Sequence, residues 1–126
     1  MTMTQPFIEF KNVWKRFGSL DVLKGINLTI DKGTVTVVIG KSGSGKSVLL
    51  KHIVGLIQED EGDVLIQGRS LNRLSEKQAR QFKKNMSYMF QDNALFDFLT
   101  AFENIALPLT ETTRMTESQI RKKVHD

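Results

Sequence analysis

The residues whose types and spacing could do chemistry gather in a short loop at positions 40–47. They satisfy the pattern G-x-x-x-x-G-K-[ST] and are Gly40, Lys41, Ser42, Gly43, Ser44, Gly45, Lys46 and Ser47. In such a loop the glycines let the backbone turn tightly, so that successive N–H groups point at nucleotide phosphates. The helix that follows presents its positive end to the same phosphates. Lys46 would reach the β- and γ-phosphates, and Ser47 would offer its hydroxyl to Mg²⁺.

The segments on either side of this loop match its expected setting. Residues 34–39 read Thr-Val-Thr-Val-Val-Ile, a β-branched run typical of a strand buried on both faces of a parallel sheet, and we expect it to be the central strand. Residues 47–56 hold apolar side chains at helical spacing. A glycine-rich turn that only caps a helix is the alternative, since chance yields roughly a few such matches per thousand sequences of this length. The order of strand, loop and helix favours the phosphate site.

The remaining elements complete an α/β pattern. Apolar residues that alternate or cluster beside turn residues predict strands at 8–14, 22–30, 64–66 and 86–90. Capping boxes predict three helix starts, at the pairs Ser75 and Gln78, Thr100 and Glu103, and Thr116 and Gln119. We expect the first of these helices to run to about Lys84, the second to stop near Pro108, and the third to be still running at Asp126.

Composition excludes several classes of protein. The 126 residues include no cysteine, which rules out disulfide frameworks, thiolate metal sites and cysteine nucleophiles. No signal peptide is apparent, and no segment approaches the roughly 18 apolar residues of a membrane span, so we expect neither secretion by signal nor a membrane-spanning chain. The net charge of +4 is too modest to choose a partner by itself.

Three motifs together resemble the N-terminal part of an ABC-transporter ATPase: Phe17 before Gly18, the loop at 40–47, and residues 88–92, which read Tyr-Met-Phe-Gln-Asp. The resemblance implies that Phe17 stacks on adenine, a contact typically worth about 1–3 kcal/mol. It also implies that Gln91 is the glutamine that ligates Mg²⁺ and orients the attacking water, and that Val48 belongs to the nucleotide site. A core phenylalanine and a solvated glutamine are the alternatives.

Within that family, the letters of residues 40–52 and 90–97 resemble ATPases of Mla-type phospholipid transporters that work with MCE-domain proteins. Lys41 stands where many importers have proline, and Val48 where many have threonine. The resemblance implies ATP and Mg²⁺ as cofactors, a transmembrane permease as partner, a homodimer of ATPase subunits and no nucleic acid. It also implies a cytoplasmic protein held peripherally at the inner face of the cell membrane through its permease.

The implied fold is α/β, a P-loop NTPase with the RecA-like ABC ATPase core and N-terminal antiparallel β strands, truncated before the signature and Walker B motifs. Residues 1–126 would form the N-terminal part of the ATPase domain, from the β subdomain and the phosphate-loop βα unit to the Q-loop and the start of the helical subdomain. The motifs that the family uses for hydrolysis follow the Q-loop glutamine, and none is present after Gln91. Residues 74–78 and 94–97 imitate them but lack the required glycines and glutamate.

These absences shape the expected function. We expect the chain alone to bind nucleotide without hydrolysing it, and an exposed central strand to make it poorly soluble. The alternatives are a non-catalytic regulatory half-domain or a decayed gene product. A different P-loop NTPase lacks support, because no Asn-Lys-x-Asp guanine motif occurs.

Three further features carry expectations of their own. We expect His52, after the loop, to face solvent. A basic stretch at 69–84 reads as a solvated face, with an anionic membrane or nucleic acid as the alternative. Residues 95–102 are rich in Leu and Phe and read either as a docking surface for the membrane subunit or as core.

Overall fold

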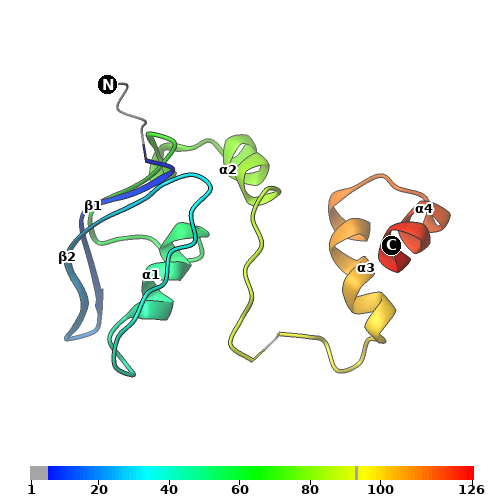
Figure 1. Ribbon diagram of the computed structural model, residues 1–126, viewed down its shortest axis with the longest axis horizontal. Helices are drawn as coiled ribbons and strands as arrows, with labels where there is room; N and C mark the ends of the chain where they lie inside the picture. The colour runs from blue at the N-terminus through cyan, green and yellow to red at the C-terminus, as the bar shows by residue number, and fades with distance from the viewer. Residues whose placement is uncertain (1–5, 93) are drawn as a thin grey trace. The chain divides into compact units, whose positions relative to one another are not determined.

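The computed structural model describes residues 6–92 and 94–126 and divides the chain into two compact units, Met1–Tyr88 and Met89–Asp126. Among the described residues, the first unit holds a sheet with the helices that follow the loop and the last strand, and the second unit holds two helices (Figure 1). Phe17 and residues 40–48 lie in the first unit, whereas Gln91 lies in the second.

The first unit is built on an antiparallel sheet. Its strands are β1 (Ile8–Phe17), β2 (Leu20–Ile30), β3 (Glu61–Ile66) and β4 (Arg69–Ser70), in the spatial order β2-β1-β3-β4. The expected N-terminal antiparallel strands are therefore confirmed, each somewhat longer than predicted. A turn at Gln67 and Gly68 joins β3 to β4.

One hydrophobic core joins this sheet to helix α1 (Lys46–Ile53). Alternate residues of the strands point into it, among them Phe10, Val13 and Val64, which are almost completely buried. Leu49 and Ile53 of α1 cover them from one side. The helix ends earlier than expected because Gly55, at φ 65°, forms a Schellman turn in which the Leu56 N–H donates to the Lys51 carbonyl at 2.9 Å.

The prediction of a central strand at residues 34–39 is wrong for this structure. All six residues are described, and they form neither a strand nor a ladder with another described segment. Val35 is 94% exposed and Ile39 is 90% exposed. A β-branched run becomes a strand only where a neighbour supplies hydrogen-bond partners, and the described residues supply none here. The strand expected at 86–90 is also wrong, since these residues form no strand in the structure.

The three capping boxes are confirmed. Helix α2 (Glu76–Lys83) follows the short 3₁₀ helix η1 (Leu71–Arg73), and α3 (Ala101–Thr112) and α4 (Glu117–His125) pack on each other in the second unit. At the start of α3 the Thr100 N–H donates to Glu103 Oε2 at 2.7 Å. The expected stop near Pro108 is wrong, since α3 continues past it at the cost of one backbone hydrogen bond.

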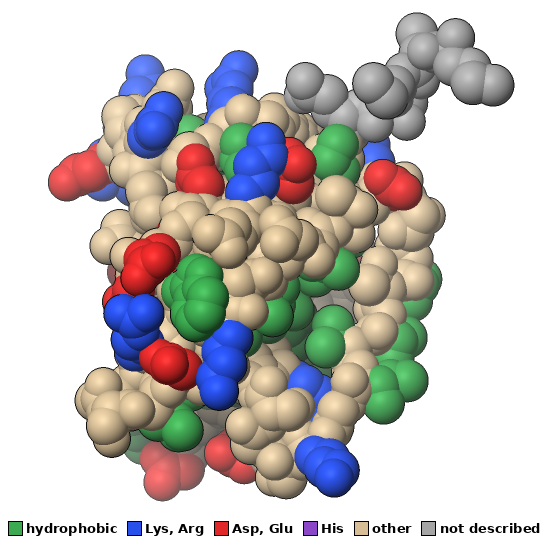
Figure 2. All heavy atoms as spheres, turned by 90° about the vertical axis from the view of Figure 1, so that its left-hand side faces the viewer, with side chains coloured by type: hydrophobic (Ala, Val, Ile, Leu, Met, Phe, Trp, Pro, Cys, Tyr) green, Lys and Arg blue, Asp and Glu red, His purple; other side chains and the backbone are tan. Residues whose placement is uncertain are grey.

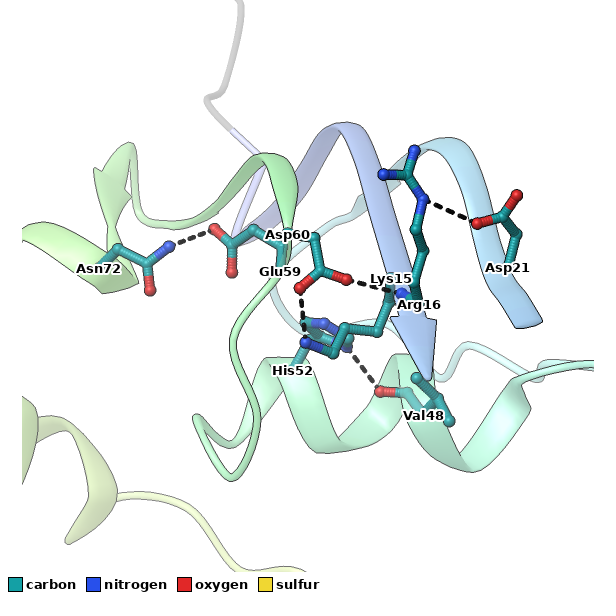
Figure 3. Close-up of polar contacts among 8 residues, drawn as sticks. All are labelled: Lys15, Arg16, Asp21, Val48, His52, Glu59, Asp60 and Asn72. Carbon is teal, nitrogen blue, oxygen red and sulfur yellow. Dashed lines mark hydrogen bonds and ion pairs between the residues drawn. The ribbon is translucent and has the colours of Figure 1, made fainter. Parts of the chain in front are cut away.

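His52 is buried, with 1% of its surface exposed, so the expectation that it faces solvent is wrong. Its position three residues after Leu49 and one before Ile53 places it on the core face of α1. Its Nδ1 lies 2.7 Å from the Val48 carbonyl (Figure 3), and its Nε2 has no hydrogen-bond partner among the described residues.

Candidate functional site

The loop at 40–47 leads directly into α1. The helix begins at Lys46 after Gly45, whose φ of 90° turns the backbone through the left-handed region. The Ser44 N–H donates to the Lys41 carbonyl at 3.2 Å, and the Leu49 N–H donates to the Gly45 carbonyl at 2.8 Å. No side chain caps the N-terminus of α1, and its first turn, which is fully described, contains no acidic residue. The positive end of the helix is therefore open to an anion.

The Lys46 side chain folds back into the loop. Its ammonium donates to the Gly40 carbonyl at 2.8 Å and to the Lys41 carbonyl at 2.7 Å. These neutral acceptors hold the cation without neutralising it, so its charge remains available to a phosphate. A nucleotide would add two or more charged oxygens to the same ammonium.

At two glycines of the loop an added side chain would meet close neighbours. A Cβ on Gly40 would lie 2.6 Å from Ser44 Oγ, inside the loop itself. A Cβ on Gly45 would lie 3.0 Å from Val22 Cγ1 and 3.1 Å from Leu23 Cδ2, because the loop packs closely against β2. The loop is therefore folded tightly on itself and packs closely against the sheet.

A cavity of about 470 Å³ borders the loop, but we do not assign it to phosphate. Loop residues 40, 44, 45 and 46 form one edge, and the rest of the lining is mostly apolar side chains of β2, α1 and residues 36–39, with Asn27 and Thr36 as the polar exceptions. Such a lining has few groups that could bind a charged ligand. The cavity is the uncovered apolar side of residues 34–39.

Phe17 ends β1 and is 48% exposed, so it is not a core phenylalanine. The Lys15 ammonium lies 5.6 Å from the centroid of its ring, within the range of a cation–π contact. The open part of the ring can accept a stacked base.

Ser47 and Gln91, the expected Mg²⁺ ligands, lie in different units. Ser47 is exposed in the first turn of α1, where its hydroxyl can meet a metal bound to phosphate. Gln91 is exposed in a turn beside Asn93, a residue outside those described. Among the described residues there is no cluster of three or more His, Asp or Glu that could hold a metal by itself. Ser47 therefore fits as a single protein ligand of a Mg²⁺ ion that is bound to a nucleotide. The other ligands of such an ion are phosphate oxygens and waters.

The second unit displays the apolar segment at 95–102. Phe96 and Phe98 are exposed, with ring centroids 5.4 Å apart. Asn104 of α3 holds the backbone of this segment: its Oδ1 accepts from the Phe96 N–H at 2.9 Å, and its Nδ2 donates to the Phe96 carbonyl at 3.0 Å. This role of Asn104 was not predicted from the sequence, although an Asn side chain near a helix start often bonds to nearby loop backbone.

Charged side chains are scattered over one face of the first unit. Lys and Arg are interspersed with Asp and Glu on the face drawn in Figure 2, with hydrophobic side chains between them. The basic residues of the stretch at 69–84 are all exposed, and Arg80 pairs with Glu76 of the same helix at 3.5 Å. The stretch is thus a solvated face in this structure.

The comparisons with known proteins agree with the motifs. The family model described as ABC transporter matches residues 23–126. The chain belongs to the ABC transporter family. It is 37% identical over 122 residues to the intermembrane phospholipid transport system ATP-binding protein MlaF of Haemophilus influenzae, a match that covers 97% of this chain and 46% of that protein. It is 40% identical over 114 residues to the probable ribonucleotide transport ATP-binding protein mkl of Mycobacterium leprae, covering 90% of this chain and 33% of that one.

A solved member of the ABC transporter family has the same fold. The dimeric, post-hydrolysis structure of the ATP-binding cassette MJ0796 with ADP and phosphate superposes with a TM-score of 0.81 and 34% identity, covering 93% of this chain and 53% of that one. The expected P-loop α/β fold with an N-terminal antiparallel sheet is confirmed. The chain spans half or less of the length of the curated relatives it matches. In the parts that the structure describes, no helix combines the length and apolar character needed to cross a membrane.

Proposed function

We propose that the chain is the N-terminal part of an ABC ATPase domain and binds Mg-ATP as part of a transport ATP-binding subunit. The observation that carries this proposal is Lys46, whose ammonium is held inside the loop by two carbonyl oxygens at the open N-terminus of α1. The family match and the fold support it. Residues 1–126 would comprise the β subdomain, the phosphate-loop βα unit, the Q-loop and the start of the helical subdomain.

Each site residue has a proposed role. The loop N–H groups at 40–47 and the Lys46 ammonium bind the phosphates, and Val48 continues the site along α1. Phe17 stacks on the adenine base. Ser47 and Gln91 contribute oxygen ligands to Mg²⁺, which would shield the negative charge of the phosphates.

We propose phospholipid movement as the process that this ATPase energises. Lys41 and Val48 support it, together with the similarity to a phospholipid-transport ATP-binding protein. A relative of similar identity is described as a ribonucleotide transporter component, so the substrate needs its own test. The proposal includes a transmembrane permease as partner, pairing with a second ATPase subunit, and a position at the cytoplasmic face of the membrane.

For these 126 residues by themselves we propose binding without turnover, because they include no catalytic carboxylate or signature motif after Gln91. A non-catalytic nucleotide-binding module makes the same prediction. The two hypotheses predict different results when a polypeptide with the remaining ATPase motifs is added. If the chain is part of a catalytic ATPase domain, ATP hydrolysis returns; if it is a regulatory module, hydrolysis does not return.

The test is calorimetric titration of the chain with Mg-ATP and Mg-GTP, followed by a steady-state phosphate-release assay. Lys46→Ala should weaken ATP binding on the order of tenfold to a hundredfold, because charged hydrogen bonds to phosphate are lost. Lys32→Ala, which removes an exposed lysine outside the loop, is the matched control and should bind normally. Unchanged affinity in Lys46→Ala, or sustained phosphate release by the chain alone, would contradict the proposal. Equal affinities for GTP and ATP would argue against an adenine-selective site.

A further inference from the structure

The end of β1, which carries Phe17, is paired with another strand on one side only. Toward β2 the ladder continues to the pair of Phe17 with Leu20. Toward β3 the last pair is Trp14 with Glu61. The ladder with β2 is also irregular here, with register shifts between Val13 and Lys15 and between Lys15 and Arg16. Backbone pairing alone therefore holds this end of β1 loosely.

Asp60, immediately before β3, supplies hydrogen bonds to the end of β1 on the side where β3 no longer pairs with it (Figure 3). Its Oδ2 accepts a hydrogen bond from the Arg16 backbone N–H at 2.6 Å, one residue before Phe17. Its own backbone N–H donates to the Trp14 carbonyl at 2.9 Å. The Asp60 side chain thus extends the hydrogen bonding of β1 beyond the last strand pair.

The second carboxylate oxygen of Asp60 acts on the Phe17 ring through Lys15. Asp60 Oδ1 pairs with the Lys15 ammonium at 2.9 Å, and this ammonium lies 5.6 Å from the centroid of the Phe17 ring. The Lys15 side chain is only 16% exposed, so it is packed rather than free in solvent. One carboxylate therefore fixes both the backbone before Phe17 and the cation beside its ring.

The charge state of Asp60 suits this arrangement. The hydrogen bond from the Arg16 backbone, and then that from Lys15, hold the pKa of the Asp60 carboxyl below its ordinary value. The carboxylate is ionised throughout the neutral range.

We propose that Asp60 is a positioning residue for nucleotide binding: it holds Phe17 in the orientation in which the ring stacks on a purine base. This inference rests on the proposed function, since it needs a nucleotide at the loop of residues 40–47. Asp60 acts through Arg16 and Lys15 and does not itself touch the nucleotide. Asp60 therefore affects how tightly the base is bound and not how tightly the phosphates are bound.

The ion pair between Arg16 and Asp21 offers a control variant for nonspecific effects at the same end of β1. The Arg16 guanidinium pairs with Asp21 at 2.8 Å and with Glu61 at 3.3 Å, and both contacts involve the side chain of Arg16, not its backbone. Asp21→Ala therefore removes an acidic group and an ion pair at the same place without releasing the backbone before Phe17 or the Lys15 ammonium.

The experiment measures the affinities of the chain for Mg-ATP and for inorganic triphosphate by calorimetry, in the unmodified protein and in Asp60→Ala, Asp60→Asn and Asp21→Ala. Complete loss of base stacking corresponds to about fivefold to a hundredfold in affinity. We expect Asp60→Ala to weaken ATP about threefold to tenfold and to leave triphosphate unchanged, because only the base loses its platform. Asp21→Ala should match the unmodified chain for both ligands.

Asp60→Asn keeps the test usable if Asp60→Ala fails to fold. It retains an oxygen that can accept from the Arg16 N–H and loses the charge that holds Lys15, so we expect it to weaken ATP less than Asp60→Ala, by up to about fivefold. Unchanged ATP affinity in both Asp60 variants would overturn the inference, as would equal losses for ATP and triphosphate. Failure of the unmodified chain to bind either ligand would instead overturn the proposed function and this inference with it.

Discussion

Two segments of the first unit that both carry strand-like patterns of apolar residues differ in structure. In β2, Ile26, Leu28 and Ile30 alternate along a strand that pairs with β1 through most of its length and packs against the core. In residues 34–39, a run of similar strand propensity stays irregular, and Val35, Val37 and Ile39 remain exposed. The difference between the two is the neighbouring strand, not the composition.

Some parts of the first unit form through contacts between residues close in sequence, and others need residues far along the chain. The loop of residues 40–47 and its helix form beside an unpaired segment, because their contacts lie within a few residues of one another and against β2. A strand instead needs hydrogen bonds from residues far along the chain or on another chain. The loop of residues 40–47 can therefore form even though the expected central strand beside it does not.

The largest expected effect comes from placing the same substitution in the paired sheet, at Val13 of β1, and in the exposed segment, at Val37. Val13→Asp puts a carboxylate into a position that is fully buried in the sheet, and it should unfold the first unit. Val37→Asp, in the exposed segment, should leave the melting temperature unchanged and raise the soluble fraction. Thermal melts by circular dichroism and sedimentation of the lysate measure both. A loss of fold in Val37→Asp would mean that residues 34–39 are packed after all.

A second pair of variants tests the backbone of the sheet. Gly62→Ala, in β3, would bring a Cβ to the Asn12 carbonyl oxygen of β1, a contact that the two strands cannot relieve without moving apart, so we expect a loss of about 3 kcal/mol or more. Gly33→Ala shares the positive φ but meets no described atom within 4 Å, and it should cost only about 1 kcal/mol. Urea denaturation compares them. Similar losses in the two variants would show that the sheet is not closely packed at Gly62.

A local contact should have a smaller effect than either sheet variant. Thr100→Ala removes the cap of α3 and should cost about 1 kcal/mol of the stability of the second unit. Thr112→Ala removes a hydroxyl that bonds only the Pro108 carbonyl within the same helix, and it should be nearly neutral. Urea denaturation followed by helical circular dichroism tests this pair. Equal losses of stability in the two variants would show that the capping box does not determine where α3 begins.

The smallest expected effect is the pH dependence of the Asp60 contacts. Because its pKa is lower in the folded chain than the ordinary 3.8, the unfolded chain binds the proton more readily, and Asp60 stabilises the fold at pH above that value. The difference in melting temperature between the unmodified chain and Asp60→Asn should be constant from about pH 5 to 8 and shrink as the pH falls below about 4. A difference that grows on acidification would contradict the assigned contacts.

The parts of the fold that could be predicted from sequence are those with local causes. The three capping boxes and the helix after Gly45 were predicted because their hydrogen bonds span three or four residues. The strands β1 and β2 were predicted because turn residues lie beside two runs of alternating apolar residues, and their antiparallel arrangement was implied by the family resemblance. The irregular structure of residues 34–39 was not predicted, since a β-branched run does not reveal whether a partner strand is present.

The candidate site divides in the same way. The loop and Lys46 could be found by motif, and Phe17 and Gln91 only through the family resemblance. His52 was misjudged, although its spacing from Leu49 and Ile53 pointed to the core face of α1. Asp60 was missed, because its partner Arg16 lies 44 residues away and no local pattern links them.

Residue-level hydrogen exchange of the chain with and without Mg-ATP tests the central claim most directly. We predict slow exchange for the paired amides of β1, fast exchange for residues 35–39 in both states, and slowing at residues 42–47 only when Mg-ATP is present. Unchanged exchange at residues 42–47 with saturating Mg-ATP would contradict the nucleotide site, and slow exchange at residues 35–39 without ligand would contradict the unpaired segment.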